Sequence, residues 1–111
     1  MIELGINNST IQLEVADNFV KRFLGLMGRK NLPQGQGLLI TNCNSIHMCF
    51  MKFPIDVIYI DEDWKIKKIV RNLKTWTEFS MCLSACSTIE LAAGEADRLN
   101  LEVGEKFKIV D

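Results

Sequence analysis

Apolar and polar residues alternate with a period of two near the start of the chain. Apolar side chains occupy every second position from residue 2 to 6 and again from residue 11 to 15. The dipeptide Asn7-Asn8 separates the two runs, and asparagine adopts positive φ angles more readily than most residues. This pattern predicts a β-hairpin whose turn is formed by the two asparagines.

Six further apolar runs have the length and composition of β-strands. They cover residues 38–41, 47–53, 55–60, 64–70, 88–92 and 107–110. Pro54 separates the second of these runs from the third, because proline cannot donate a hydrogen bond within a sheet. The polar sequence Asp61-Glu62-Asp63 then predicts a turn that joins the third run to the fourth as a second hairpin. Residues 72–86 are weakly patterned, so we expect a long loop there.

Two segments carry helical signals. Phe19, Phe23 and Met27 recur with a spacing of four, which places them on one face of a helix. Asp17 stands before this series and is a favourable N-cap residue. A second, single helical turn is expected at residues 96–101, so the predicted helices form only a small part of the chain.

Length and composition bound the architecture. With 111 residues, of which 48% are hydrophobic and 24% charged, the chain is typical of a single globular domain spanning residues 1–111. Many short strands with one or two small helices favour a mainly β domain over an α/β design. We expect either an antiparallel β-sandwich or a partly open barrel.

Charge and hydropathy argue against several classes of partner. The formal net charge is −1 and basic residues are interspersed with acidic ones, whereas nucleic-acid binding relies on a concentrated basic face. No apolar run approaches the ~20 residues that a membrane-spanning helix needs. The N-terminus lacks the basic start and apolar core of a signal peptide. We therefore expect a cytoplasmic protein with reduced cysteines, no nucleic-acid partner and no membrane segment.

Several short motifs occur in a fixed order along the chain. They are residues 22–29 (Arg-Phe-Leu-Gly-Leu-Met-Gly-Arg), Leu32, Gly35, Gly37-Leu38-Leu39, the run 47–61, residues 90–94 (Glu-Leu-Ala-Ala-Gly) and Val103-Gly104-Glu105. In this order they resemble the bacterial and archaeal family called domain of unknown function 192. The resemblance covers nearly the whole chain after the first hairpin. It implies a compact, mostly antiparallel β fold of jelly-roll type with small helices, and it implies no activity.

The chain departs from the family pattern at three places. Many relatives have Trp-Met-Lys-Asn-Thr where residues 50–54 read Phe-Met-Lys-Phe-Pro. Asn100 stands where glycine often precedes the final turn, and asparagine is the next best residue for a positive φ. Cys82 and Cys86 are not part of the family pattern, so the resemblance assigns them no shared role.

Asp56 is a carboxylate inside an otherwise apolar predicted strand. Strand alternation places it on the same face as Ile58 and Ile60, opposite its two neighbours in sequence. A carboxylate on a buried face must accept hydrogen bonds or pair with a cation. The structural interpretation is a side chain held by backbone amides or by an arginine such as Arg22 or Arg29. The functional interpretation is a general base or a ligand-binding group at the floor of a pocket.

His47 is the only histidine, and cysteines stand close to it in sequence. Cys43 or Cys49 could form a nucleophilic pair with it, or both could supply soft ligands for a metal. Cys82 and Cys86 would be the remaining ligands, but the spacing departs from the Cys-x2-Cys pairs of structural zinc sites. A free cysteine in a β core is most often a small hydrophobic residue. We therefore expect no metal and no cofactor.

Arg22 and Arg29 lie seven residues apart and would share one stripe of a continued helix. They could form salt bridges with acidic residues of the sheet, or a bidentate clamp for a carboxylate or phosphate. Gly35 and Gly37 could present backbone amides to the same anion. A Gly-x-Gly sequence alone is a weak signal for such a site.

These observations define a candidate pocket. Its members are Arg22, Arg29, Gly35, Gly37, His47, Met51, Lys52 and Asp56. They include no recognisable nucleophile and base, so we assign no catalytic residues. The sequence favours a non-catalytic binding or accessory module for a small ligand or a protein partner. The alternatives are a hydrolase or transferase that uses Asp56 on a small polar substrate, and a metal or thiol site at Cys43, His47 and Cys49.

Overall fold

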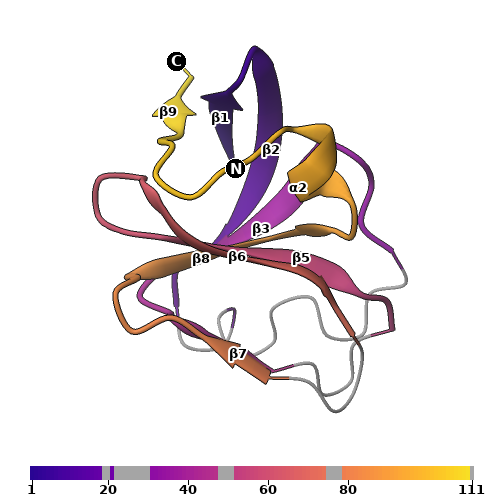
Figure 1. Ribbon diagram of the computed structural model, residues 1–111, viewed down its shortest axis with the longest axis vertical. Coiled ribbons are helices and arrows are strands. Elements are labelled where there is room, and N and C mark those ends of the chain that lie inside the picture. Colours follow the sequence, from indigo (N-terminus) through magenta and orange to yellow (C-terminus); the bar gives the residue numbers. More distant parts are fainter. Residues whose placement is uncertain (19–20, 22–30, 48–51, 75–78, 111) are drawn as a thin grey trace.

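A computed structural model describes residues 1–18, 21, 31–47, 52–74 and 79–110 (Figure 1). These residues form mostly short strands and one short helix. In chain order the elements are β1 (Ile2–Ile6), β2 (Ser9–Ala16), β3 (Gln36–Ile40), β4 (Ser45–His47), β5 (Ile55–Ile60), β6 (Ile66–Leu73), β7 (Phe79–Met81), β8 (Ser87–Ala92), α2 (Glu95–Arg98) and β9 (Lys108–Ile109).

The first hairpin is confirmed. β1 pairs with β2 in antiparallel register from Ile2 opposite Leu13 to Ile6 opposite Ser9. The turn residues Asn7 and Asn8 have φ angles of 51° and 63°. Two successive positive φ angles give a two-residue turn whose twist matches that of the flanking strands, which explains the asparagine pair in the sequence.

Seven strands form one curled sheet in the order β6-β5-β8-β3-β2-β1-β9. Every neighbouring pair is antiparallel except β2 and β3, which are parallel. A bridge between Lys65 and Lys106 brings the start of β6 against the segment that leads into β9. The N–H of Phe107 also donates to the carbonyl of Trp64 at 3.0 Å. The two ends of the sheet thus meet at this point, which confirms the predicted mainly β, partly open barrel; the finer jelly-roll connectivity is not confirmed.

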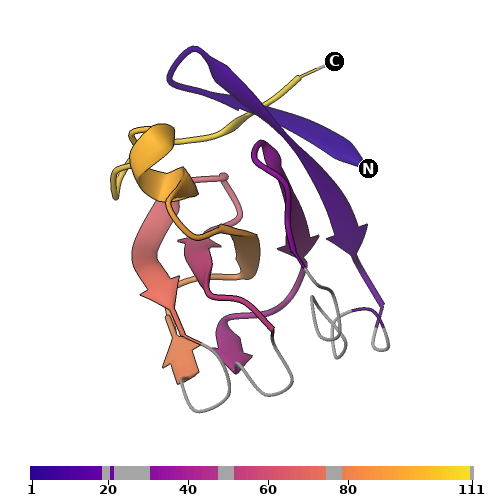
Figure 2. The ribbon, with the colours of Figure 1, turned by 90° about the vertical axis from the view of Figure 1, so that its right-hand side faces the viewer.

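β5 lies between two hydrophobic cores, and its alternation agrees with the sequence prediction. Ile58 and Ile60 face the first core, which also receives apolar residues of α2 and the segment after it. Ile55, Val57 and Tyr59 face the second core. Figures 1 and 2 show α2 and β7 on opposite sides of β5 and β8. Because both faces are covered, every residue of β5 is buried, including the carboxylate of Asp56.

A separate two-stranded sheet is formed by β4 and β7, in antiparallel register from Ser45 opposite Met81 to His47 opposite Phe79. The prediction of a long loop over residues 72–86 was therefore wrong, since β7 lies within it. A three-residue strand is too short to show a period of two. Its pairing partner lies far away in the sequence, so only the folded chain brings the two segments together.

The helical predictions have different outcomes. The turn expected at residues 96–101 is α2, which begins one residue earlier and ends at Arg98. The longer helix with Phe19, Phe23 and Met27 falls outside the described residues. At its expected start, the N–H of Lys21 donates to Oδ1 of Asn18 at 2.9 Å, a contact typical of an N-cap side chain. The described residues include no helix long and apolar enough to cross a membrane.

We predict that Gly37→Ala destabilises the protein because β3 packs closely against its neighbours there. A Cβ atom at Gly37 would lie 2.5 Å from the carbonyl oxygen of Glu90 and 2.9 Å from Cδ2 of Leu13. Such overpacking should lower the free energy of unfolding by about 1–3 kcal/mol. Gly5→Ala is the matched control, since its nearest contact would be 3.4 Å from Val110. Urea denaturation of both variants tests this, and equal losses would contradict it.

Candidate functional site

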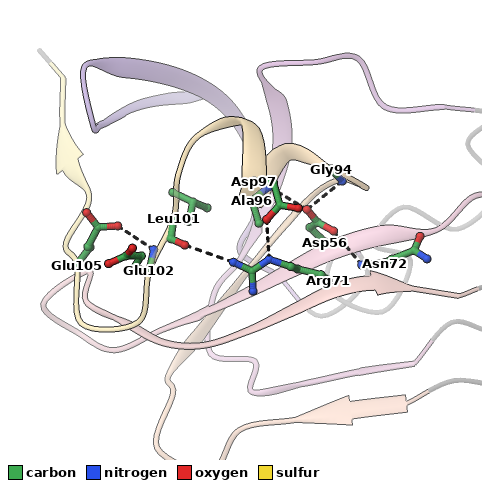
Figure 3. Close-up of polar contacts among 9 residues, drawn as sticks. All are labelled: Asp56, Arg71, Asn72, Gly94, Ala96, Asp97, Leu101, Glu102 and Glu105. Atoms are coloured by element: carbon green, nitrogen blue, oxygen red, sulfur yellow. Dashed lines mark hydrogen bonds and ion pairs between the residues drawn. The ribbon is translucent and has the colours of Figure 1, made fainter.

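The carboxylate of Asp56 is enclosed by backbone amides (Figure 3). Oδ1 accepts a hydrogen bond from the N–H of Asn72 at 2.9 Å. Oδ2 accepts from the N–H groups of Gly94 at 3.0 Å and Ala96 at 2.8 Å. The residue is only 1% exposed. This geometry matches the structural interpretation of Asp56, in which backbone donors satisfy a buried carboxylate.

A bulge in β6 explains why Asp56 stands at this position. Ile55 pairs with Leu73 and Val57 pairs with Val70, so one residue of β5 faces two residues of β6. Asn72, the second of those two, has a φ of 54°. The extra residue of a bulge leaves the regular ladder, and here its N–H finds its acceptor in the Asp56 side chain.

Glu95 holds the start of α2 to the glycine loop before β3. Its carboxylate accepts from Nε of Arg98 at 2.5 Å and from Nη2 of the same residue at 2.9 Å. It also accepts from the N–H of Gly35 at 2.8 Å. The Arg98 guanidinium, followed by the Gly35 amide, lowers the pKa of Glu95 despite its burial. The amide that the sequence suggested for an anion is therefore already bonded to a carboxylate of the chain.

A small groove of about 200 Å³ lies beside α2 and β6. It contains an ion pair between Nε of Arg71 and Oδ1 of Asp97 at 2.9 Å (Figure 3). Nη2 of Arg71 also reaches the carbonyl of Leu101 at 3.5 Å. Both charged side chains are largely exposed, so solvent screens the pair and its contribution to stability is small. We interpret this groove as surface structure.

Polar side chains gather on the second-core face of the sheet. Tyr59, Ser80 and Glu90 are all buried there, as is Thr88, whose Oγ1 donates to the carbonyl of Cys43 at 2.7 Å. Among the described residues, the hydroxyl oxygens of Tyr59 and Ser80 have no hydrogen-bond partner. Buried polar groups are almost always paired, so these two hydroxyls require an explanation.

Burial dominates the electrostatics of Tyr59 and raises its pKa to about 12. The nearby Ser80 hydroxyl opposes this rise, although the two oxygens do not form a hydrogen bond of acceptable geometry. The thiols of Cys43 and Cys82 and the carboxylate of Glu90 add to it. The phenol is therefore a neutral group at physiological pH, able to donate one hydrogen bond and to accept others.

The cysteines of the described segments are free and half-buried. Cys43 and Cys82 pack against the second core. The Cys43 thiol contacts the carbonyl of Ser45 at 3.1 Å, and the Cys82 thiol lies 3.4 Å from the hydroxyl of Ser84. No three histidine, cysteine or acidic side chains of the described residues are grouped as metal ligands. Cys49, the third member of the alternative thiol site, falls outside them.

Five of the eight candidate pocket residues lie in described segments. Gly37 is buried by close packing, while Gly35 and Asp56 both contact the start of α2 through hydrogen bonds. Lys52 is exposed, and His47 belongs to β4. Arg22, Arg29 and Met51 fall outside the described residues.

Described residues next to the segments that contain Arg22, Arg29 and Met51 pack in or against the second core. Ala16 and Leu32 flank the segment with the two arginines, and Phe53 follows the segment with Met51. Sequence reasoning missed Tyr59 and Ser80 as candidate residues. The available signal was a single tyrosine in a strand of isoleucine and valine.

We predict that Asp56→Asn destabilises the protein strongly. The amide group that replaces one carboxylate oxygen would point a donor at one or more of the three backbone N–H groups. Loss of charge-assisted hydrogen bonds and an unpaired buried donor should cost about 2–3 kcal/mol of unfolding free energy. Asp97→Asn removes an exposed carboxylate and is the matched control, with a much smaller expected effect. Similar losses in the two variants, measured by urea denaturation, would be incompatible with the observed role of Asp56.

The lowered pKa of Glu95 predicts an acid-dependent loss of stability. A carboxyl group with a depressed pKa in the folded state stabilises the fold above its unfolded pKa, and this stabilisation is lost as pH falls. Glu95→Gln should therefore be less stable than the original protein at neutral pH. The difference in unfolding free energy between the two proteins should narrow as pH falls below 4.5, the ordinary pKa of a glutamate side chain. Denaturation midpoints measured against pH test this, with Glu102→Gln as the control for loss of one negative charge.

Known proteins share both the sequence pattern and the fold. The model of the DUF192 family, described as uncharacterized ACR, matches residues 2–109. A UPF0127 protein of Pyrococcus furiosus is 34% identical over 103 residues, covering 88% of this chain and 86% of that protein. A UPF0127 protein of Thermococcus sibiricus is 35% identical over 102 residues, covering 88% of this chain and 66% of that relative.

Two crystal structures have the same fold. One is of a protein of unknown function from Novosphingobium aromaticivorans, with a TM-score of 0.85 over 96% of this chain and 83% of that chain. The other, from Sinorhizobium meliloti, is of a protein proposed to be a transcription regulator, with a TM-score of 0.87 over 97% of this chain and 91% of that chain. Both are 21% identical to this chain, so they support the fold alone. By the extent of the family match and the identity of its relatives, the chain belongs to the uncharacterised DUF192 family, whose archaeal members are called UPF0127 proteins.

Proposed function

We propose that this protein is a non-catalytic binding module for a small polar molecule, held on the second-core face of the sheet. The observation that carries this proposal is the pair of buried hydroxyls on Tyr59 and Ser80, which find no partner among the described residues. A ligand that hydrogen-bonds both oxygens would satisfy two groups that otherwise remain costly to bury.

The surroundings of Tyr59 favour a particular ligand chemistry. The phenol is neutral at physiological pH because its pKa is about 12, so it can donate a hydrogen bond to a ligand oxygen. The Ser80 hydroxyl is also neutral and can donate one hydrogen bond and accept others. A neutral molecule with both donors and acceptors, such as an amide or a polyol, suits this environment.

The candidate pocket residues from the sequence have two roles in the proposal, as ligand contacts and as structural support. Arg22, Arg29, His47, Met51 and Lys52 stay in the proposal as candidate ligand contacts. The support is that described residues next to their segments, Ala16, Leu32 and Phe53, pack in or against the second core. Gly35, Gly37 and Asp56 form the framework of the binding face, because their hydrogen bonds and close packing hold α2, β3 and β5 together.

The geometry of Asp56 disfavours a catalytic role for this residue. Its carboxylate is buried and accepts three backbone hydrogen bonds, so a hydrolase or transferase that uses it as a base would have to break them. Free, half-buried cysteines support a reducing location such as the cytoplasm. The net charge of −1 supports a partner other than nucleic acid.

Thermal-shift screening with neutral amides and polyols tests the proposal. A ligand at 100 times its Kd should stabilise the fold by about 2.7 kcal/mol. Tyr59→Phe and Ser80→Ala should each abolish this stabilisation. Without ligand, Tyr59→Phe should change the unfolding free energy by no more than about 0.5 kcal/mol, because it removes no internal hydrogen bond.

Thr88→Val is the matched control for removing a buried hydroxyl. It should lose stability without ligand, because the Thr88 hydroxyl bonds to Cys43 at 2.7 Å, but it should retain the ligand response. The proposal fails if no neutral polar compound stabilises the protein, or if a stabilising compound acts equally on Tyr59→Phe.

A further inference from the structure

A second surface feature lies at the opposite end of the molecule from β7. It is a groove of about 880 Å³ between the β1–β2 turn and the C-terminal segment. Figure 1 shows β1 and β9 side by side at this end of the molecule. Its volume falls in the range of binding pockets for small molecules and short peptides. The lining comes from residues 5–10, 105–106 and 108–110. Ile6, Ile109 and Val110 provide apolar surface, and the other side chains are polar.

Lysines outnumber acidic residues in the described lining of this groove. Lys106 and Lys108 line it, are exposed, and form no ion pair among the described residues. Glu105, the only acidic residue of the described lining, accepts hydrogen bonds within the chain. Its Oε1 accepts from the N–H of Glu102 at 2.8 Å and from Nδ2 of Asn7 at 3.3 Å. The protein as a whole carries a charge of −1, so this positive surface is a local feature.

The walls of the groove are held in place before any ligand binds. Nδ2 of Asn7 donates to the carbonyls of Leu99 at 3.1 Å and Asn100 at 2.9 Å, which ties the hairpin turn to the end of α2. On the other side, the N–H of Val110 donates to the carbonyl of Glu3 at 2.9 Å. A preformed groove loses less conformational entropy on binding than a mobile one.

β9 also offers an open strand edge beside the groove. Val110 bonds to β1, and Lys108 stands opposite Gly5 two residues earlier. In an antiparallel pair the bonded positions alternate, so the N–H and C=O of Ile109 point away from β1. β9 is the last strand of the sheet order, and the Ile109 side chain is 57% exposed. An extended chain could therefore pair with β9 there.

We propose that this groove binds an extended, acidic segment of a partner protein. Acidic side chains of that segment would contact Lys106 and Lys108, its apolar side chains would cover Ile109 and Val110, and its backbone would pair with Ile109. This site is separate from the proposed small-molecule site, so each can fail without the other.

A short fluorescein-labelled peptide that alternates glutamate and valine is the probe, and fluorescence anisotropy is the measurement. The full chain should bind this peptide, and binding should weaken as salt is added. Lys106→Glu and Lys108→Glu should each weaken binding about fivefold or more, since each replaces an attraction with a repulsion. Lys21→Glu makes the same change of net charge at an exposed site elsewhere and should leave the affinity within about twofold.

Three outcomes would overturn the proposal. The first is no binding, or equal binding of a peptide with lysine in place of glutamate. The second is binding that Lys106→Glu and Lys108→Glu leave unchanged while circular dichroism shows both variants folded. The third is displacement of the peptide by single-stranded DNA that binds more tightly through the same lysines, which would identify a nucleic-acid site instead.

Discussion

The carboxylate of Asp56 is the constraint on which this fold depends. Through three backbone hydrogen bonds it connects β5 to the bulge of β6 and to the start of α2. A helix of four residues has too few internal hydrogen bonds to be stable alone, so tertiary contacts must hold it. Asp56 and Glu95 supply such contacts from two directions, from the sheet and to the loop before β3. Apolar residues of α2 and the following turn then complete the first core.

The hydrogen bonds of Asp56 also distinguish the two faces of β5, one with a structural role and one with the proposed ligand site. The first-core side of β5 is used for structure, because its one charged group is fully bonded to backbone. The second-core side of β5 carries Tyr59, and β7 and β8 add Ser80 and Glu90 to the same buried region. Polar groups inside a hydrophobic core reduce stability unless they are paired, and the described residues supply no hydrogen-bond partner for the hydroxyls of Tyr59 and Ser80. The proposed ligand site rests on this difference between the two faces.

The asparagine pair of the first hairpin has two structural roles. Its backbone forms the two-residue turn, and the Asn7 side chain bonds to carbonyls at the end of α2. Helix ends leave carbonyl groups without internal partners, and Asn7 from a distant segment bonds to the carbonyl of the C-cap residue Leu99 and to that of Asn100 after it. This contact also fixes one wall of the groove beside β9. The two proposed sites therefore lie on different elements and use different chemistry, one based on buried hydroxyls and the other on exposed lysines.

The sequence by itself determined the hairpin, the strands of the large sheet and the two faces of β5. These properties follow from alternation, which is a local feature of the chain and needs no knowledge of distant segments. The ordered motifs also identified the family. The position of Asp56 on an apolar strand marked it as unusual, but the sequence left its partners open.

Only the tertiary structure decided those partners, which lie 16, 38 and 40 residues away along the chain. It also decided the parallel pairing of β2 with β3, the short sheet of β4 and β7, and the placement of Ser80 near Tyr59. Each of these features joins segments whose own residue patterns are too short or too weak to specify a partner. Their association depends on which arrangement buries the most apolar surface while satisfying backbone hydrogen bonds, and that is a property of the whole chain.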